Sequence, residues 1–146
     1  MKANKLEKTA KMLIRNYRDN RRTVAGMHKY RPGLVERAGI SIEGYIPWDY
    51  SPEGVKMPRR DKKVLCDYYR SRRQMETVDI AIDGRLNGRD QELVSDTVRE
   101  CLSVPELMEK YGISSATVTR VRRKGIEAVM DEIELQGLSS DYFSND

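Results

Sequence analysis

The sequence feature that most constrains the fold is a regular spacing of side chains between Val64 and Arg85. The positions that keep this spacing are Val64, Tyr68, Ser71, Met75, Val78, Ile82 and Arg85, with imperfect matches at Ser71 and Arg85. Steps that alternate between four and three residues line one face of an α-helix, whereas a strand repeats at every second residue. The spacing predicts one long helix from about Arg59 to Arg85. Its apolar face is either a core within one chain or the seam of a homodimer, and both interpretations remain open.

The first part of the chain, from Asn4 to about Val24, has the same helical period. Its apolar or neutral positions are Leu6, Ala10, Leu13, Tyr17, Asn20 and Val24. A cationic stripe occupies the opposite face and consists of Lys8, Lys11, Arg15, Arg18 and Arg22. We expect a helix that packs on the central one. The stripe would at most contact DNA phosphates, and its alternative is a solvated face.

Residues 26–58 hold five of the ten glycines and four of the five prolines. Proline and glycine at this density predict an irregular insert in which helix does not persist. The insert also contains Trp48, the only tryptophan, so we expect an ordered loop with a short hairpin across residues 42–45. Its apolar side chains would be buried against the helices or against a partner. The only histidine, His28, has no partner that the sequence identifies.

The charge is divided unevenly along the chain. Residues 1–73 carry nineteen Lys and Arg against eight Asp and Glu, and residues 74–146 carry eight against fifteen. A basic half and an acidic half favour a polyanionic partner and a separate protein-facing surface, although the two halves could instead complement each other. The chain has no apolar run of about 18 residues and no signal-peptide core. We therefore expect a cytoplasmic protein that has no membrane partner.

Residues suited to catalysis or to metal binding are scarce. The chain has one histidine and lacks phosphate-loop, HExxH and GxSxG motifs. Cys66 and Cys101 have neither the spacing of zinc ligands nor a neighbouring base. The sequence therefore predicts no catalytic residue, no metal and no cofactor, and a protein that is not an enzyme.

The C-terminal part carries the clearest local signals. A short helix is expected over residues 91–102. Ser103, with Pro105 in the next turn and Glu106 three residues later, is typical of a capping box that starts a helix over residues 104–111. Gly112 would end that helix in a tight turn, and a second helix would begin after Ser114 and continue past Lys124. This pattern predicts a helix-turn-helix.

The second helix of that motif would present its polar face to DNA. Small hydroxyl side chains near its start can approach base edges closely, and arginines further along can reach guanine or phosphate. The residues expected to bind DNA are Ser114, Ser115, Thr117, Thr119, Arg120, Arg122, Arg123 and Lys124. The alternative interpretation is an αα-hairpin whose basic face is solvated.

The stretch from Glu92 to Val129, centred on residues 103–118, resembles the fourth region of sigma factors. The wider layout, with its basic N-terminal helix around residues 13–18, is similar to the RinA/ArpU-like late transcriptional regulators of phages. Together with the helical spacings, this layout predicts an all-α fold with a basic helical region over residues 1–88 and a sigma-like domain with an acidic tail over residues 89–146. The resemblance implies a function, namely binding to promoter DNA, activation of late genes and contact with host RNA polymerase. The alternatives are a small-terminase-type packaging protein and an adaptor that binds RNA polymerase but not DNA.

Overall fold

The chain folds into helices. The computed structural model describes residues 2–137, and every regular element in that range is helical. These elements are α1 (Ala3–Arg15), α2 (Tyr17–Tyr30), α3 (Pro32–Arg37), the 3₁₀ helix η1 (Pro52–Gly54), α4 (Arg59–Arg85), α5 (Gly88–Val98), α6 (Val104–Tyr111) and α7 (Ser115–Gln136). The predicted all-α fold is confirmed. None of these helices combines the length and the apolar character needed to span a membrane. The expected acidic tail lies outside the described residues.

The chain divides into two compact units. The terminal unit contains residues 1–18 and 77 onward, and the middle unit contains residues 19–76. This division differs from the one at residue 88 that the sequence led us to expect. The reason is that α1, from the start of the chain, packs against α7 near its end. The long helix α4 contributes to both units, with the change at Glu76 and Thr77.

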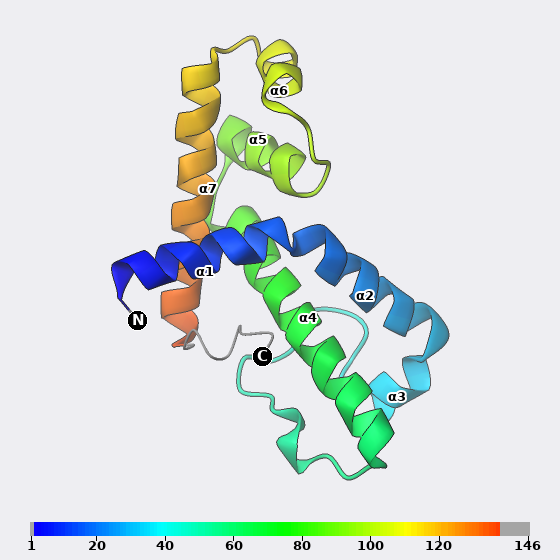
Figure 1. The fold of residues 1–146 in the computed structure, drawn as a ribbon. Coiled ribbons are helices and arrows are strands. Elements are labelled where there is room, and N and C mark those ends of the chain that lie inside the picture. Colours follow the sequence, from blue (N-terminus) through cyan, green and yellow to red (C-terminus); the bar gives the residue numbers. More distant parts are fainter. Residues whose placement is uncertain (1, 138–146) are drawn as a thin grey trace. The chain divides into compact units, whose positions relative to one another are not determined.

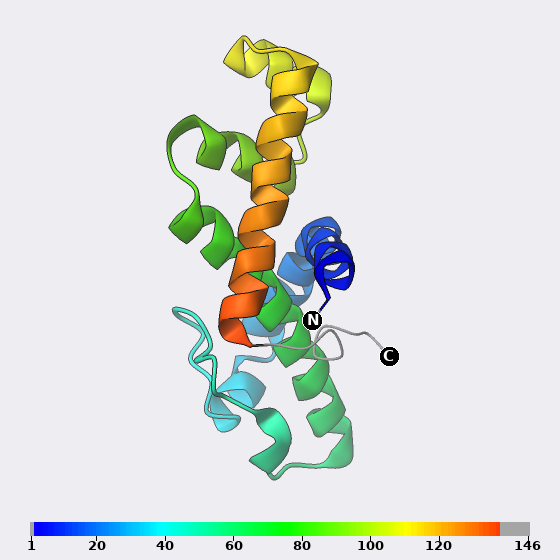
Figure 2. The ribbon, with the colours of Figure 1, turned by 90° about the vertical axis from the view of Figure 1, so that its left-hand side faces the viewer.

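In the terminal unit, α7 is the helix against which the others pack. Contacts join it to α1, α5 and α6, and Figures 1 and 2 show α1 crossing α7. Each of these helices contributes fully buried apolar side chains, among them Leu13, Leu93, Leu107, Val121 and Ile133. Burial of such side chains contributes about 1.5–3 kcal/mol each, so α7 is fixed along most of its length.

The N-terminal helix is shorter than predicted. α1 ends at Arg15, Asn16 has φ −89° and ψ 1°, and α2 begins at Tyr17, so the single helix expected to Val24 is interrupted. Asparagine favours helix ends because its side chain competes for backbone hydrogen bonds. The predicted apolar positions are nevertheless buried, with the exception of the half-buried Asn20.

Part of the segment that we expected to be irregular is helical. α2 continues through Gly26 to Tyr30, and α3 begins at Pro32. Proline is well tolerated in the first turn of a helix, because the N–H that it lacks would have no partner there. A glycine within a helix costs only about 1 kcal/mol, which tertiary packing can offset. The prediction that helix does not persist in residues 26–58 was therefore wrong for residues 26–30 and 32–37.

Residues 41–50 form a loop and not the predicted hairpin, since no strand occurs in the described part of the chain. Ile40 and Ile46 are buried, as expected. Trp48 and Tyr45 are 75% and 52% exposed, so the helices do not cover them, and their contact with a partner stays a prediction. Their outward position follows from how the loop backbone is held.

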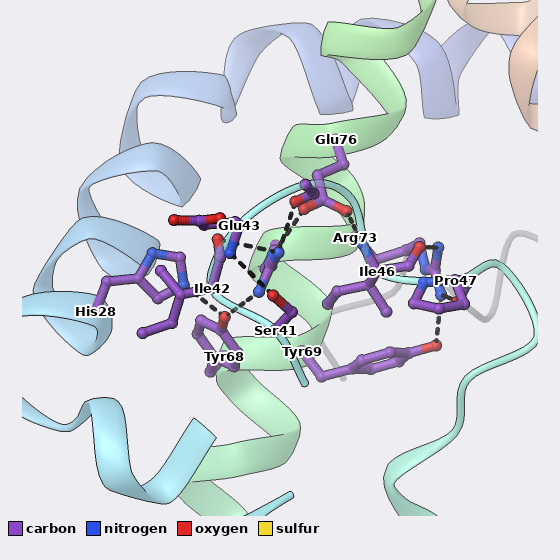
Figure 3. A network of polar contacts seen from close by, with 12 residues as sticks. His28, Ser41, Ile42, Glu43, Ile46, Pro47, Tyr68, Tyr69, Arg73 and Glu76 are labelled. Carbon is purple, nitrogen blue, oxygen red and sulfur yellow. Dashed lines mark hydrogen bonds and ion pairs between the residues drawn. The ribbon is translucent and has the colours of Figure 1, made fainter. Parts of the chain in front are cut away.

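Two buried arginines of α4 hold this loop (Figure 3). Arg72 donates to the carbonyl oxygen of Gly44 at 2.8 Å, and Arg73 donates to that of Ile46 at 3.0 Å. Glu76 accepts a hydrogen bond from the backbone N–H of Ile46 at 2.8 Å and pairs with Arg72 at 2.7 Å. Buried polar groups need partners, and here the arginines and the loop carbonyls satisfy each other. The loop is held through its backbone, which leaves the side chains of Tyr45 and Trp48 outside.

The long helix α4 has the bounds that the sequence predicted. Of the seven positions in its regular spacing, Tyr68, Val78 and Ile82 are buried within the single chain. Arg85 is exposed and pairs with Glu132 at 3.1 Å. These burials agree with the interpretation of a core helix, and the homodimer stays a prediction.

Candidate nucleic-acid interface

The start of α6 is fixed by the predicted capping box. The Ser103 hydroxyl accepts a hydrogen bond from the backbone N–H of Glu106 at 3.3 Å. The Glu106 carboxylate accepts one from the backbone N–H of Ser103 at 3.0 Å and is fully exposed, and these hydrogen bonds lower its pKa. Two of the free N–H groups at the helix start are thereby satisfied.

The turn between α6 and α7 has the predicted geometry. Gly112 ends α6 with φ 63° and ψ 43°, a left-handed conformation that favours glycine. The N–H of Ile113 then donates to the carbonyl of Met108 at 3.2 Å. Ser114 caps α7, because its hydroxyl accepts from the N–H of Thr117 at 3.2 Å. The hydroxyl of Ser114, which we expected to contact DNA, therefore stabilises the helix start.

A carboxylate on α5 anchors the end of α6. Asp96 accepts hydrogen bonds from the hydroxyl of Tyr111 at 2.5 Å and from the ammonium of Lys110 at 2.7 Å. Burial alone would raise the pKa of Asp96, but these two hydrogen bonds outweigh it and lower the pKa. Burial and the carboxylate both raise the pKa of Tyr111. No spacing in the sequence indicated this contact, which joins side chains on two separate helices.

The first turns of α7 expose one continuous face. We name this the α7 outer face, and it consists of Ser115, Ala116, Thr119, Arg120 and Arg123, all exposed. Val118 and Val121, on the opposite side, are fully buried. Arg120 has no ion-pair partner among residues 2–137, whereas Arg123 pairs with Glu7 of α1 and with Glu127. The outer face is therefore accessible, and its guanidinium groups are in different electrostatic environments.

The other predicted DNA-binding residues lie beside this face. Thr117 is half-buried, and its hydroxyl is 3.1 Å from that of Ser114. Lys124 pairs with Asp90 of α5 at 3.0 Å. Arg122 projects on the side of α1 and lines a separate hollow. The helical turn of 100° per residue explains this separation of residues 122–124, since neighbours on a helix point in different directions.

We name the hollow beside Arg122 the cationic hollow. Its volume is about 420 Å³, and its charged lining consists of Lys11, Arg15, Arg18 and Arg122. Three of these belong to the cationic stripe predicted from the sequence. The spacing identified the stripe, but the sequence did not indicate that α1 would place it beside α7.

The described residues offer little for metal chemistry. No group of three or more histidine, cysteine, aspartate or glutamate side chains in residues 2–137 is placed to hold a metal ion. Cys66 is half-buried, and Cys101 is exposed. The α7 outer face and the cationic hollow both combine exposure with positive charge. Comparison of the chain with protein-family models, with curated proteins and with solved structures finds no match.

Proposed function

We propose that this protein binds double-stranded DNA in a sequence-specific manner, with the α7 outer face in the major groove, and that it regulates transcription. The observation that carries the proposal is the composition of this face. It begins with two small side chains, Ser115 and Ala116, continues with Thr119 and Arg120, and has no carboxylate before Glu127. Small side chains at the start let the backbone come close to the bases, and the arginines supply directional donors.

The chemistry of each position suits contact with base edges. Arg120 can donate two hydrogen bonds to a guanine, the contact that most often specifies a base in the major groove. Thr119 and Ser115 can donate to or accept from several bases, and the methyl group of Ala116 can contact that of thymine. The capped turn before α7 and the Asp96 anchor on α6 support this role, because a reading helix must be held rigidly.

The transcriptional part of the proposal depends on the resemblance to RinA/ArpU-like regulators. That resemblance implies a promoter as the DNA site, late-gene activation as the outcome and host RNA polymerase as a further partner. The charges of the outer face support DNA binding alone. The experiments below therefore distinguish an activator from a packaging protein and from a polymerase adaptor.

The decisive experiment compares a selected duplex with a scrambled duplex of equal length. Sites are first selected from random DNA with the full-length protein. Arg120→Ala should weaken binding to the selected duplex by about 1–3 kcal/mol and affect the scrambled duplex much less. Arg60→Ala, which removes an exposed arginine from the middle unit, is the matched control. It should leave the ratio of the two affinities unchanged.

Three other outcomes would contradict parts of the proposal. Equal loss on both duplexes with Arg120→Ala would mean that α7 holds the backbone and does not read the sequence. Absence of binding to either duplex at low salt would favour the polymerase adaptor. Ring-sized oligomers in light scattering would favour the small-terminase type, whereas a monomer or dimer would agree with a regulator.

A further inference from the structure

The cationic hollow gathers four positive side chains from two distant parts of the sequence. Lys11 and Arg15 come from α1, Arg18 comes from the first turn of α2, and Arg122 comes from α7. All four belong to the terminal unit, and all four are exposed. Like charges that converge on one hollow repel one another, so this arrangement costs free energy unless an anion offsets it.

Neutralising groups are scarce at the hollow. No carboxylate lines it. The side chains of Arg15, Arg18 and Arg122 form neither a hydrogen bond nor an ion pair within residues 2–137, and Lys11 lies 4.0 Å from Glu7. Several other cations of the terminal unit are paired, as with Arg99, which contacts Asp79 at 2.7 Å. The hollow is thus a place where a bound anion would meet several free guanidinium donors.

The rest of the lining includes apolar side chains. Ile14, Val98 and Ile126 contribute to it, from α1, α5 and α7. A volume of about 420 Å³ falls within the range of small-molecule sites, about 300–1,000 Å³, and exceeds the needs of an isolated inorganic anion. Guanidinium groups suit phosphate because their planar donors can pair with two of its oxygens. The apolar lining suits the less polar body that carries the phosphate.

We propose that the cationic hollow binds a phosphate group carried on a nucleoside, which is either a free nucleotide or one nucleotide of a DNA strand. The alternative in which the ligand is a nucleotide of a DNA strand rests on the proposed function. Arg122 follows Thr119 by three residues on α7, so a strand at the edge of the groove would pass close to the hollow. Binding of a free nucleotide does not depend on that function.

Cys101 provides a direct probe of occupancy. It is exposed, lines the hollow and is the one non-glycine residue in the described range with a left-handed φ, 53°. In a Cys66→Ser variant of the full chain, the rate at which iodoacetamide modifies Cys101 reports access to the hollow. The additions are a mixed-sequence duplex, deoxyadenosine 5′-monophosphate, and deoxyadenosine, which lacks the phosphate. We expect the duplex, the mononucleotide or both to slow the modification, and deoxyadenosine to have no effect.

Paired variants connect the protection to the cations. Arg15→Ala with Arg18→Ala should weaken protection by about tenfold or more, because both side chains are charged donors to the phosphate. A tenfold change corresponds to about 1.4 kcal/mol. Lys2→Ala with Lys5→Ala is the control, since it removes the same charge at exposed positions outside both the hollow and the cationic stripe. Should the alanine variant lose its helical circular dichroism, Arg15→Gln with Arg18→Gln replaces it and keeps most of the side-chain volume.

The outcomes separate the two sources of phosphate. Protection by the duplex alone assigns the hollow to a DNA strand, and protection by the mononucleotide assigns it to a free ligand. Either result supports the proposal if it depends on Arg15 and Arg18. An unchanged modification rate with both additions would overturn it, as would protection that both paired variants retain equally. The ratio of the two duplex affinities in Arg120→Ala is a separate measurement. A negative result at the cationic hollow therefore does not contradict the proposal for the α7 outer face.

Discussion

Arg123 on the α7 outer face forms an ion pair with Glu7 of α1, a residue from the opposite end of the chain. Its guanidinium also lies 3.3 Å from Glu127, one helical turn further along α7. Two carboxylates therefore surround a side chain that we propose for DNA contact. Arg120, on the same face, has no such partner in the described part of the chain. The outer face thus has one guanidinium ready for a ligand and one that must first exchange partners.

This relationship predicts that Glu7→Gln strengthens binding to DNA. The substitution removes a negative charge beside Arg123 and Lys11 and keeps the side-chain size. Exposed ion pairs contribute about 0.2–1 kcal/mol, so the gain in affinity should be at most about fivefold and should decline at high salt. Titrations of one duplex at several salt concentrations measure it. Glu134→Gln, which removes an exposed carboxylate from the last turn of α7, is the control and should change affinity less.

The local features of the candidate interface could be predicted from the sequence, because short-range rules govern them. Ser103 and Glu106 are three residues apart, and Gly112 ends a helix by its own conformational freedom. The contact between Arg123 and Glu7 could not be predicted in this way. It depends on how α1 packs against α7, and a single sequence contains no period or spacing that reports such packing.

A close approach between α5 and α7 predicts that Gly125→Ala destabilises the terminal unit. A Cβ atom at Gly125 would lie 2.9 Å from Cγ1 of Val94, a buried and β-branched side chain with little freedom to move. Overpacking of this kind costs about 1–3 kcal/mol, more than the roughly 1 kcal/mol that alanine gains in a helix. Urea unfolding of the variant should show the loss.

The same substitution behaves differently once space is available. In a Val94→Ala background the colliding methyl groups are absent, so Gly125→Ala should be neutral or stabilising there. Equal destabilisation in both backgrounds would show that Val94 is not the cause. We expected helix to continue through this region, but a glycine inside a helix gave no indication of the close approach that requires it.

The anchor of α6 predicts that Tyr111→Phe destabilises the terminal unit by about 0.5–1.5 kcal/mol, the usual contribution of one hydrogen bond. Tyr30→Phe, at a tyrosine that is 74% exposed, should have a smaller effect. The loss should depend on pH because the hydrogen bonds lower the pKa of Asp96. A lowered carboxyl pKa stabilises the fold above the unfolded value of about 3.9, and this contribution disappears as the pH falls through the folded value. The difference between the wild type and Tyr111→Phe should therefore shrink below about pH 4.

The middle unit shows a second limit of the sequence. Arg72 and Arg73 belong to a basic stretch that is indistinguishable by composition from the exposed Arg59 and Arg60 at the start of α4. The structure nevertheless buries Arg72 and Arg73 almost completely. Helical phase places them on the side of the loop, and the loop carbonyls then supply the partners. Composition reports the charge of a segment, whereas burial depends on which residues come to face it.

His28 lies at one end of this buried network. Its Nε2 atom is 2.6 Å from the hydroxyl of Tyr68, and that hydroxyl accepts a hydrogen bond from Arg72 at 2.7 Å. Burial, together with the charge of Arg72, lowers the pKa of His28. Arg72 donates to a lone pair of the Tyr68 oxygen and leaves the hydroxyl proton free, so the hydroxyl donates that proton to the unprotonated Nε2 of His28. The neutral form of His28 therefore fits the folded state.

The last prediction is that the middle unit loses stability as the pH falls below about 6.5, and that His28→Gln removes part of this loss. Between the unfolded pKa and the lowered folded pKa, the unfolded chain binds the proton more strongly, so protonation favours unfolding. One proton limits the slope to about 1.4 kcal/mol per pH unit, and above the unfolded pKa stability should level off. Glutamine stays neutral and can still accept from Tyr68. Urea unfolding followed by the fluorescence of Trp48, which lies in the middle unit, measures both proteins across this range. Parallel curves for the wild type and His28→Gln would show that His28 does not couple protonation to folding.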